Sequence, residues 1–419
     1  MCMVLLAFAF GNLSHRCFAE EFVSNDGWTV GTPIVMYWGD GKALTDARAE
    51  EAAVGGYNVV WITAVAQAKM AEQKGLRTIL MHPLLSVDSL DGGSRQASLD
   101  ALIDAYQKSP AAYAYLIADE PPLPMLTGLG RLVEYIRLRD PGHLSYINIF
   151  PLPSYVEEYM PAVKPSLLSQ DYYQFKSDHD STGYLQNLQY TSQTAKAAGG
   201  IPFMNVVQAV AFDDKWRVPG AGELRFLNYS TLAYGAEGIH YFLYGPTSPP
   251  ASGGLIDTNG TPTSVYDALK PLNGEFVEVA TELQPLNFIG AYLKGYEVNP
   301  PEIPSLPASS PFNISGVAST LTYTAGDPLK GILLGLFNLD GKTLEDATFV
   351  VVVNNDYTTE KTYTLSGPGP LSVFNASTGQ WIASGKNEVS ITLAKGGGIL
   401  VGLSSDVDRV NKDHSPPNT

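Results

Sequence analysis

The sequence is poor in cysteine, with only Cys2 and Cys17, both close to the N-terminus. Residues 1–19 contain a short apolar run and end in a small residue, Ala19, before Glu20. This pattern is typical of a cleavable secretory signal. We therefore predict a secreted or periplasmic protein whose mature chain has no cysteine, which excludes disulfides and a thiol nucleophile from the mature protein.

Several other absences narrow the function classes. No later apolar stretch approaches the roughly 20 residues of a membrane span. No basic run occurs and the net charge is −16, which argues against a nucleic-acid partner. The six histidines do not occur at metal-ligand spacing and no G-x-S-x-G motif is present, so we expect neither a metal site nor a cofactor. The acidic segment 177–181 is more typical of a surface loop than of a cation site.

A repeated pattern of helix and strand fills the first two thirds of the chain. Ala-rich helical segments end in glycine, the usual helix stop, and an apolar strand follows at once, as in 50–62 and 194–208. Near-continuous apolar strands are typical of a parallel sheet that is buried on both faces. Eight strands are predicted, at 33–38, 58–63, 77–82, 113–119, 144–150, 166–173, 202–208 and 238–244.

Eight such units over residues 22–285 predict an α/β fold of the (β/α)8 TIM-barrel type. The alternative is a doubly wound open sheet. It is disfavoured because residues 37–44, after the first strand, lack the spacing of a glycine-rich phosphate loop. The pattern changes near residue 285, and short strands with Gly, Asn and Pro between them predict a β-sandwich over residues 286–404. Residues 405–419 are expected to form a loose polar tail.

The carboxyl ends of barrel strands form the face on which barrel enzymes place their active sites. Aromatic residues make up 11% of the chain, with 23 tyrosines, and several of them fall at these strand ends. Aromatic rings suit the apolar faces of sugar rings, so we predict a carbohydrate as the substrate or ligand. The candidate residues at the strand ends are Trp38, Asp40, Trp61, His82, Asp119, Glu120, Asn148, Asp171, Tyr172, Tyr173, Gln208, Tyr241 and Tyr244.

Carboxylates among aromatic residues indicate cleavage of a glycosidic bond, which needs a proton donor and a second carboxylate. The segment AYAYLIADEPP (112–122) places Asp119 and Glu120 at the end of a buried strand. Partial burial would raise the pKa of Glu120 toward neutrality, so Glu120 is predicted to be the general acid. In the alternative interpretation, these acids only cap the loop before Pro121.

The segment ADEPP also resembles the Asn-Glu-Pro motif of clan A glycoside hydrolases, in which the Glu is the acid/base. The chain further resembles the family 42/agarase-like group of bacterial secreted proteins, through segments such as GGYNVVWI, YINIFP, LLSQDYYQF and LAYGAEGIHYFLYG. The resemblance extends over the barrel and the β domain. It implies a secreted, barrel-based hydrolase that acts on a poly- or oligosaccharide.

Two positions depart from the clan pattern. Asp119 replaces the Asn that precedes the acid, and Gln208 replaces the nucleophilic Glu at the end of the seventh strand. An amide cannot act as a carboxylate nucleophile, so Asp171 is the favoured second carboxylate, as base or nucleophile, with Gln208 as a sugar hydrogen-bonding group. Asp40 and the pair Asp213–Asp214 are weaker candidates.

Two rival functions remain open at this point. One is a non-catalytic carbohydrate-binding protein on a barrel that has lost its nucleophile, and Gln208 supports it. The other is a structural or adhesive surface protein in which the β domain is the functional part. The surroundings of Asp171 distinguish catalysis from binding, because a carboxyl group held in an ion pair away from Glu120 would favour binding alone.

Overall fold

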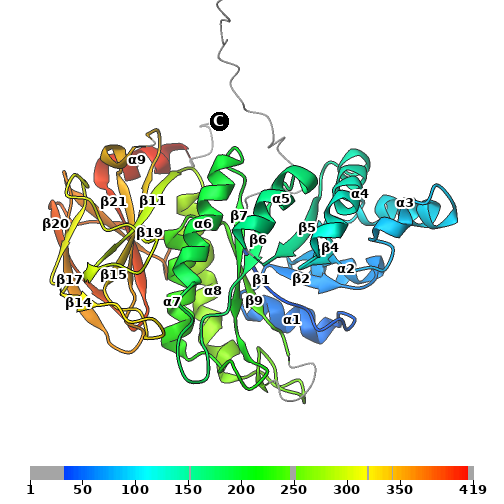
Figure 1. Ribbon diagram of the computed structural model, residues 1–419, viewed down its shortest axis with the longest axis horizontal. Helices are drawn as coiled ribbons and strands as arrows, with labels where there is room; N and C mark the ends of the chain where they lie inside the picture. Colours follow the sequence, from blue (N-terminus) through cyan, green and yellow to red (C-terminus); the bar gives the residue numbers. More distant parts are fainter. Residues whose placement is uncertain (1–32, 151, 246–251, 319, 342, 414–419) are drawn as a thin grey trace, which may run out of the picture.

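The computed structural model describes residues 33–150, 152–245, 252–318, 320–341 and 343–413. Its larger part is a closed barrel of eight parallel strands, one for each predicted strand (Figure 1). The barrel fold is thereby confirmed and the open sheet is excluded. In barrel order the strands are β1 (Ile34–Tyr37), β2 (Val59–Ile62), β3 (Arg77–Leu80), β4 (Ala112–Asp119), β5 (Leu144–Ile149), β6 (Leu168–Asp171), β7 (Phe203–Gln208) and β9 (Gly238–Phe242).

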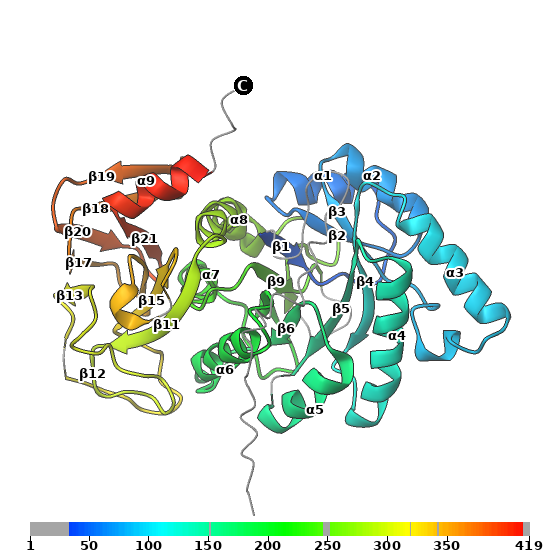
Figure 2. The ribbon, with the colours of Figure 1, turned by 90° about the horizontal axis from the view of Figure 1, so that it is seen from above.

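Helices surround this barrel on the outside (Figure 2). The first of them begins after Thr45, whose side chain accepts a hydrogen bond from the Arg48 amide, and ends before Gly56, which adopts a positive φ of 78°. The helices are α1 (Asp46–Val54), α2 (Ala68–Gln73), α3 (Ser94–Tyr106), α4 (Leu126–Arg139), α5 (Pro153–Val163), α6 (Tyr184–Ala197), α7 (Ala221–Ala233) and α8 (Ser264–Leu283). None of the described helices is long and apolar enough to cross a membrane.

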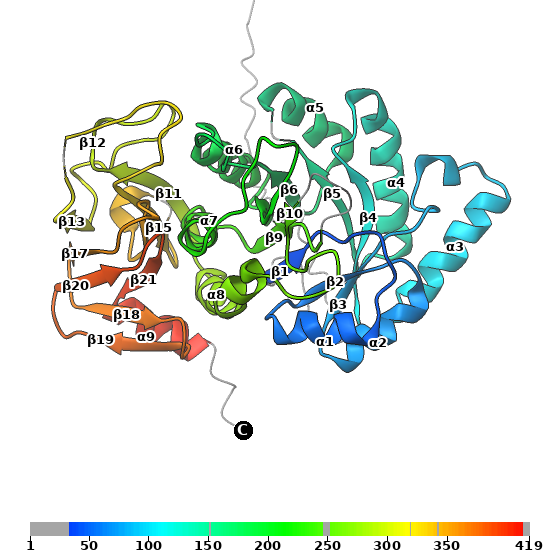
Figure 3. The ribbon, with the colours of Figure 1, turned by 90° about the horizontal axis from the view of Figure 1, so that it is seen from below.

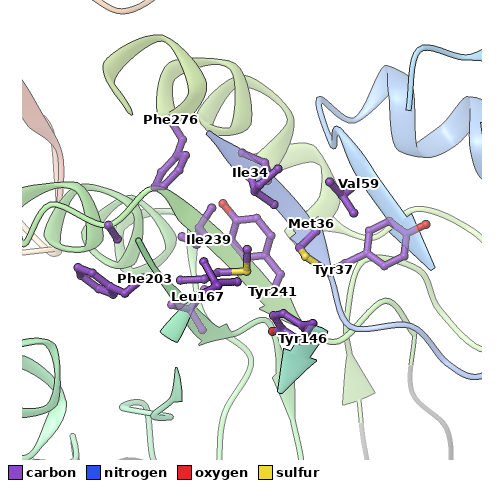
Figure 4. Packing of buried hydrophobic residues seen from close by; sticks show 14 of the residues in the cluster. Ile34, Met36, Tyr37, Val59, Tyr146, Leu167, Phe203, Ile239, Tyr241 and Phe276 are labelled. Carbon is purple, nitrogen blue, oxygen red and sulfur yellow. The ribbon is translucent and has the colours of Figure 1, made fainter. Parts of the chain in front are cut away.

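Side chains alternate between the barrel interior and the surrounding helices. Strand β9 pairs with β1 so that His240 lies beside Met36 and Tyr241 beside Tyr37. The interior side carries His240, while Tyr241 lies on the helix side, where its hydroxyl donates to Asn228 of α7 over 3.0 Å. Figure 4 shows the core around β1 and β9, with the Phe276 ring of α8 packed toward the strands. This alternation decides which strand-end residues can reach a ligand.

The second part of the molecule is a β-sandwich, as predicted. A six-stranded antiparallel sheet has the order β11-β15-β16-β21-β18-β19, and a three-stranded sheet has the order β13-β17-β20 (Figure 3). The strands of the two sheets are β11 (Asn287–Lys294), β13 (Asn313–Ser315), β15 (Ile332–Asn338), β16 (Phe349–Asn354), β17 (Lys361–Ser366), β18 (Leu371–Asn375), β19 (Gln380–Ala383), β20 (Glu388–Leu393) and β21 (Gly398–Leu403).

The six-stranded sheet is covered on both faces, which explains why β15 and β16 are buried throughout. Leu334 and Val352 pack toward the three-stranded sheet, whereas Leu333 and Val351 belong to the core that continues into the barrel. Helix α7 lies against this second face. A Cβ atom on Gly335 would lie 2.0 Å from the Ala233 carbonyl oxygen, so only glycine permits this approach of strand to helix.

Two expectations about the chain ends have different outcomes. The predicted signal, residues 1–19, lies outside the described residues. The predicted loose polar tail is wrong in its first part, because Ser404–Asp413 forms helix α9. Val407 and Val410 are three residues apart on this helix and are 3% and 2% exposed. Their burial gives a largely polar segment enough apolar contact to fold against the sandwich.

Candidate active site

Strand β4 ends at Asp119, and Glu120 follows in a left-handed conformation with φ of 42°. The Glu120 amide still donates to the Asn148 carbonyl oxygen over 2.9 Å, which extends the pairing of β4 and β5 by one residue. A non-glycine residue at positive φ costs of the order of 1 kcal/mol, and such strain often occurs at functional sites. Both residues lie at the barrel rim, as the sequence predicts, but Glu120 is exposed rather than partly buried as expected.

A chain of buried polar side chains crosses the barrel below this rim. Asn148 donates to the Asp119 carboxylate over 3.1 Å and accepts from the Ser169 hydroxyl over 3.1 Å. The Tyr146 hydroxyl contacts both Ser169 at 2.8 Å and His240 at 2.9 Å. Burial lowers the pKa of His240 to about 3, so its imidazole is neutral. The network holds Asn148 in one orientation between the ends of β4 and β6.

Asp171 at the end of β6 is the most perturbed carboxyl group of this site. It is 7% exposed, and its Oδ1 atom has no hydrogen-bond partner within the described residues. Burial, and then the negative charge of Glu120, raise the pKa of Asp171 to about 7, although hydrogen bonds from Tyr173 and Asn148 act in the opposite direction. In the described part of the chain, no Lys or Arg forms an ion pair with it.

Asp119 shows a weaker change in the same direction. Removal from water and the nearby charge of Glu120 raise its pKa, while the hydrogen bond from Asn148 partly opposes this. Three carboxyl groups therefore influence one another at the ends of β4 and β6. Such a group can hold a proton near neutral pH, which is what proton transfer to or from a substrate requires.

Aromatic rings line the barrel mouth next to these acids. The Trp38 ring lies 5.0 Å from the Trp61 ring and 5.0 Å from the His240 ring, measured between centroids. Phe242 lies between Trp38, at 6.5 Å, and Tyr173, at 5.2 Å. Trp38, Tyr173 and Phe242 are half-buried, so part of each ring is accessible. The predicted residues Trp38, Trp61 and Tyr173 thus lie together at the mouth of the barrel.

His82 and Tyr172 lie on either side of this group. His82 lines a pocket of about 490 Å³ with Ile117 and Ala118 of β4, and burial lowers its pKa. Tyr172 stacks with Phe150 at 6.5 Å, and its hydroxyl hydrogen-bonds to Ser181. The His82 imidazole accepts from the Leu84 amide. Because the hydrogen bonds of both side chains are made away from Asp171, we place His82 and Tyr172 at the margin of the site.

Gln208 is not available to a sugar, contrary to the prediction. It is fully buried, its side-chain oxygen accepts from the Phe175 amide over 2.9 Å, and its nitrogen donates to the carbonyl oxygens of Phe175 and Arg217 over 3.0 and 2.6 Å. These bonds fix the loops after β6 and β7. The position of the clan nucleophile is therefore occupied by a structural amide.

Three further residues that were predicted to bind substrate do not face the barrel mouth. Tyr241 lies on the helix side of β9, and Tyr244 donates to the Glu51 carboxylate of α1 over 3.0 Å. Asp40 accepts two hydrogen bonds from the Arg48 guanidinium, over 3.1 and 2.8 Å, and this pairing holds the pKa of Asp40 below its usual range. The reason is geometric, because these side chains point toward α1 and α7 rather than into the barrel mouth.

The sequence prediction missed His240, Phe242 and Phe212. Phe212 follows β7 and lies 5.4 Å from Tyr173. The signal for His240 and Phe242 was available. In a strand, residues two apart share a face, so the choice of Tyr241 excluded its direct neighbours His240 and Phe242, which lie on the opposite face. No cluster of three or more potential metal ligands occurs in the part of the chain that the structure describes.

Comparison with known proteins gives similarity in fold only. No family model matches the sequence, and no curated protein matches it. Among solved structures, one described as a glycoside hydrolase superposes with a TM-score of 0.56 at 13% identity, covering 88% of this chain and 92% of that one. A glycoside hydrolase family 5 protein from Bacteroides vulgatus gives a TM-score of 0.55 at 12% identity, covering 88% and 89%. The resemblance to the family 42/agarase-like group is not confirmed.

Proposed function

We propose that the protein is a secreted glycoside hydrolase that cleaves a poly- or oligosaccharide, with Glu120 and Asp171 as its two catalytic carboxyl groups. The observation that carries this proposal is the state of Asp171. Its carboxyl group is buried at the barrel mouth and forms no ion pair with any Lys or Arg that the structure describes. Burial and the charge of Glu120 raise its pKa to about 7. The aromatic rings beside it offer surfaces on which a sugar ring can stack.

The pKa of Asp171 also bears on how the two roles are divided. The sequence predicted Glu120 as the proton donor and Asp171 as the second carboxylate. A group with a pKa of about 7 is the one that still holds a proton near neutral pH. We therefore assign proton donation to the leaving oxygen to Asp171, and the second carboxylate function, on the sugar or on water, to Glu120. Tyr173 donates to the Asp171 carboxylate and so stabilises it after the proton has left.

A second candidate function is non-catalytic binding of carbohydrate. One observation favours it. Gln208 occupies the position at the end of the seventh strand where clan A enzymes have a carboxylate, and its side chain hydrogen-bonds to backbone groups. The surroundings of Asp171 support catalysis over binding alone. The negative charge of Glu120 contributes to the raised pKa of Asp171, and no Lys or Arg among the described residues forms an ion pair with Asp171.

The test is a hydrolysis screen of the full chain against plant, algal and microbial glycans, with release of reducing ends as the readout. Glu120→Gln and Asp171→Asn should each lower turnover by roughly 100-fold or more on any glycan that is cleaved. Glu158→Gln changes an exposed carboxyl group on α5, outside the barrel, and serves as the control. Wild-type turnover in either site variant would remove that residue from the mechanism, and binding without cleavage by the wild type would favour the second function.

A further inference from the structure

The β-sandwich carries a pocket that the proposed mechanism does not use. It encloses about 440 Å³, and we call it the distal pocket. Two half-buried tyrosines form one wall, with their ring centroids 6.3 Å apart and their planes nearly perpendicular. Polar side chains of both signs complete the lining. The residues used below are Tyr296, Tyr323, Asp327, Lys330, Asp356 and Thr358.

The distal pocket lies beside the loop that follows β6, which is the loop that begins at Asp171. Asp180 of this loop donates its amide to the Gly326 carbonyl oxygen over 2.9 Å, and its carboxylate accepts from Tyr357 over 2.7 Å. Arg217 forms an ion pair with the same carboxylate at 2.9 Å. The pocket is therefore held against the carboxyl end of the barrel, on the side where the candidate active site opens.

Aromatic residues lie between the two sites. Phe150 shares a pocket of about 480 Å³ with Glu120 at the barrel rim. Phe150 stacks with Tyr172 at 6.5 Å and an interplanar angle of 23°. The Tyr172 hydroxyl hydrogen-bonds to Ser181, and the next residue, Thr182, hydrogen-bonds to Tyr323. The Tyr323 ring contacts the Tyr296 ring in the distal pocket.

The chemistry between the two sites suits a neutral sugar chain. The rings offer apolar faces for stacking, and Asp327, Lys330 and Thr358 offer hydrogen-bond acceptors and donors to sugar hydroxyls. Asp356 is held by Lys361 at 3.0 Å, which fixes its carboxylate at the pocket wall. The lining has no excess of positive charge and the chain carries a net charge of −16, so a polyanionic glycan would be repelled.

We propose that the distal pocket binds one part of a neutral polysaccharide while another part of the same chain lies at Glu120 and Asp171, with Phe150, Tyr172 and Tyr323 beneath the segment between them. This inference rests on the proposed function and extends it. It identifies the substrate as a polymer long enough to reach both domains, and it gives the β-sandwich a direct role in substrate recognition.

The test uses the full chain and four neutral polysaccharides, namely galactomannan, xylan, laminarin and agarose, in affinity gel electrophoresis and in initial-rate kinetics. Tyr323→Ala should weaken retention by the polymer that the wild type binds best by about tenfold. It should also lower the ratio of kcat/KM for that polymer to kcat/KM for its trisaccharide by a similar factor. Tyr323→Phe keeps the ring and should retain most of the binding, while Tyr292→Ala, a half-buried tyrosine elsewhere in the sandwich, is the matched control.

The outcomes separate the two levels of the proposal. If the wild type cleaves a polymer and Tyr323→Ala behaves like Tyr292→Ala, the distal pocket is not a subsite, but the proposed function stands. An equal loss on polymer and trisaccharide also contradicts the inference, because it shows damage to the barrel site. If the wild type cleaves a glycan in the broad screen but neither binds nor cleaves any of the four neutral polymers, the inference fails and the proposed function stands. Thermal melting of each variant identifies a loss that arises from unfolding.

Discussion

Glu120 directly follows β4 and Asp171 ends β6, and the charge of Glu120 contributes to raising the pKa of Asp171 to about 7. If Asp171 donates the proton, kcat/KM should fall as the pH rises through about 7, because the donor is then ionised. In Glu120→Gln the negative charge is lost, so the pKa of Asp171 should fall. Carboxyl carbon chemical shifts followed by NMR from pH 4 to 9 measure this titration directly. An unchanged Asp171 titration in that variant would show that the two groups are not coupled.

Gln208 makes hydrogen bonds to the backbone of both loops that border the site, so its contribution should be to stability. Gln208→Ala would leave buried groups of Phe175 and Arg217 without partners and should cost roughly 3 kcal/mol of unfolding free energy. Denaturant unfolding measures this loss.

Gln208→Glu introduces the residue type of the nucleophile in clan A glycoside hydrolases, which the sequence resembles, and is the informative companion variant. A carboxylate there would face two carbonyl oxygens, which repel it, so we expect lower stability and no gain in turnover. A rise in turnover would show that position 208 reaches the substrate after all.

The barrel could be predicted from sequence because its signals are local. Four of the apolar strands, β2, β3, β7 and β9, follow a helix-ending glycine, and eight alternating helix and strand units allow few other folds. The residues at strand ends were also correctly located along the chain. The directions of their side chains were not predicted correctly, because a shift of one residue along a strand moves a side chain from the barrel mouth to the helix layer. Tyr241 was selected in this way, whereas His240 and Phe242 face the mouth. Tyr244 lies beyond the end of β9, and its hydroxyl donates to Glu51 of α1.

Partners that are distant in sequence were the second source of error. From sequence, Asp40 is a candidate acid at the barrel rim, but in the structure it forms an ion pair with Arg48 of α1. Gln208 is a candidate sugar ligand, but in the structure its side chain hydrogen-bonds to the backbone at Phe175. Both outcomes depend on how loops return to the barrel, which no local pattern specifies. Asp171 was correctly singled out as a strand-end acid, but its raised pKa depends on burial and on Glu120, a residue from another strand.

Trp38 and Tyr244 provide a paired test of ligand-facing against core aromatic residues. Trp38 is half-buried at the barrel mouth, so Trp38→Ala should raise KM or weaken sugar binding while lowering the melting temperature only slightly. Tyr244 is 3% exposed, stacks on Tyr37 at 4.6 Å and donates to Glu51. Tyr244→Ala should therefore cost about 3 kcal/mol or more of stability. If the two variants show the opposite balance, the assignment of the barrel mouth is wrong.

Glu237 gives a prediction about stability that does not depend on catalysis. It precedes β9, its carboxylate accepts from the Phe203 amide over 3.0 Å, and burial raises its pKa to about 8 from an ordinary value of 4.5. Because the folded state binds this proton more tightly than the unfolded state, stability should decrease as the pH rises from about 4.5 through 8. Glu237→Gln keeps an acceptor for Phe203 without an ionisable group, so its melting temperature should match the wild type near pH 4 and exceed it at pH 9.

Glu158→Gln, at an exposed helix position, is the control and should leave the wild-type difference in melting temperature between the two pH values unchanged. Melting curves of the three proteins at pH 4 and pH 9 give the comparison, and an equal drop for wild type and Glu237→Gln would contradict the raised pKa.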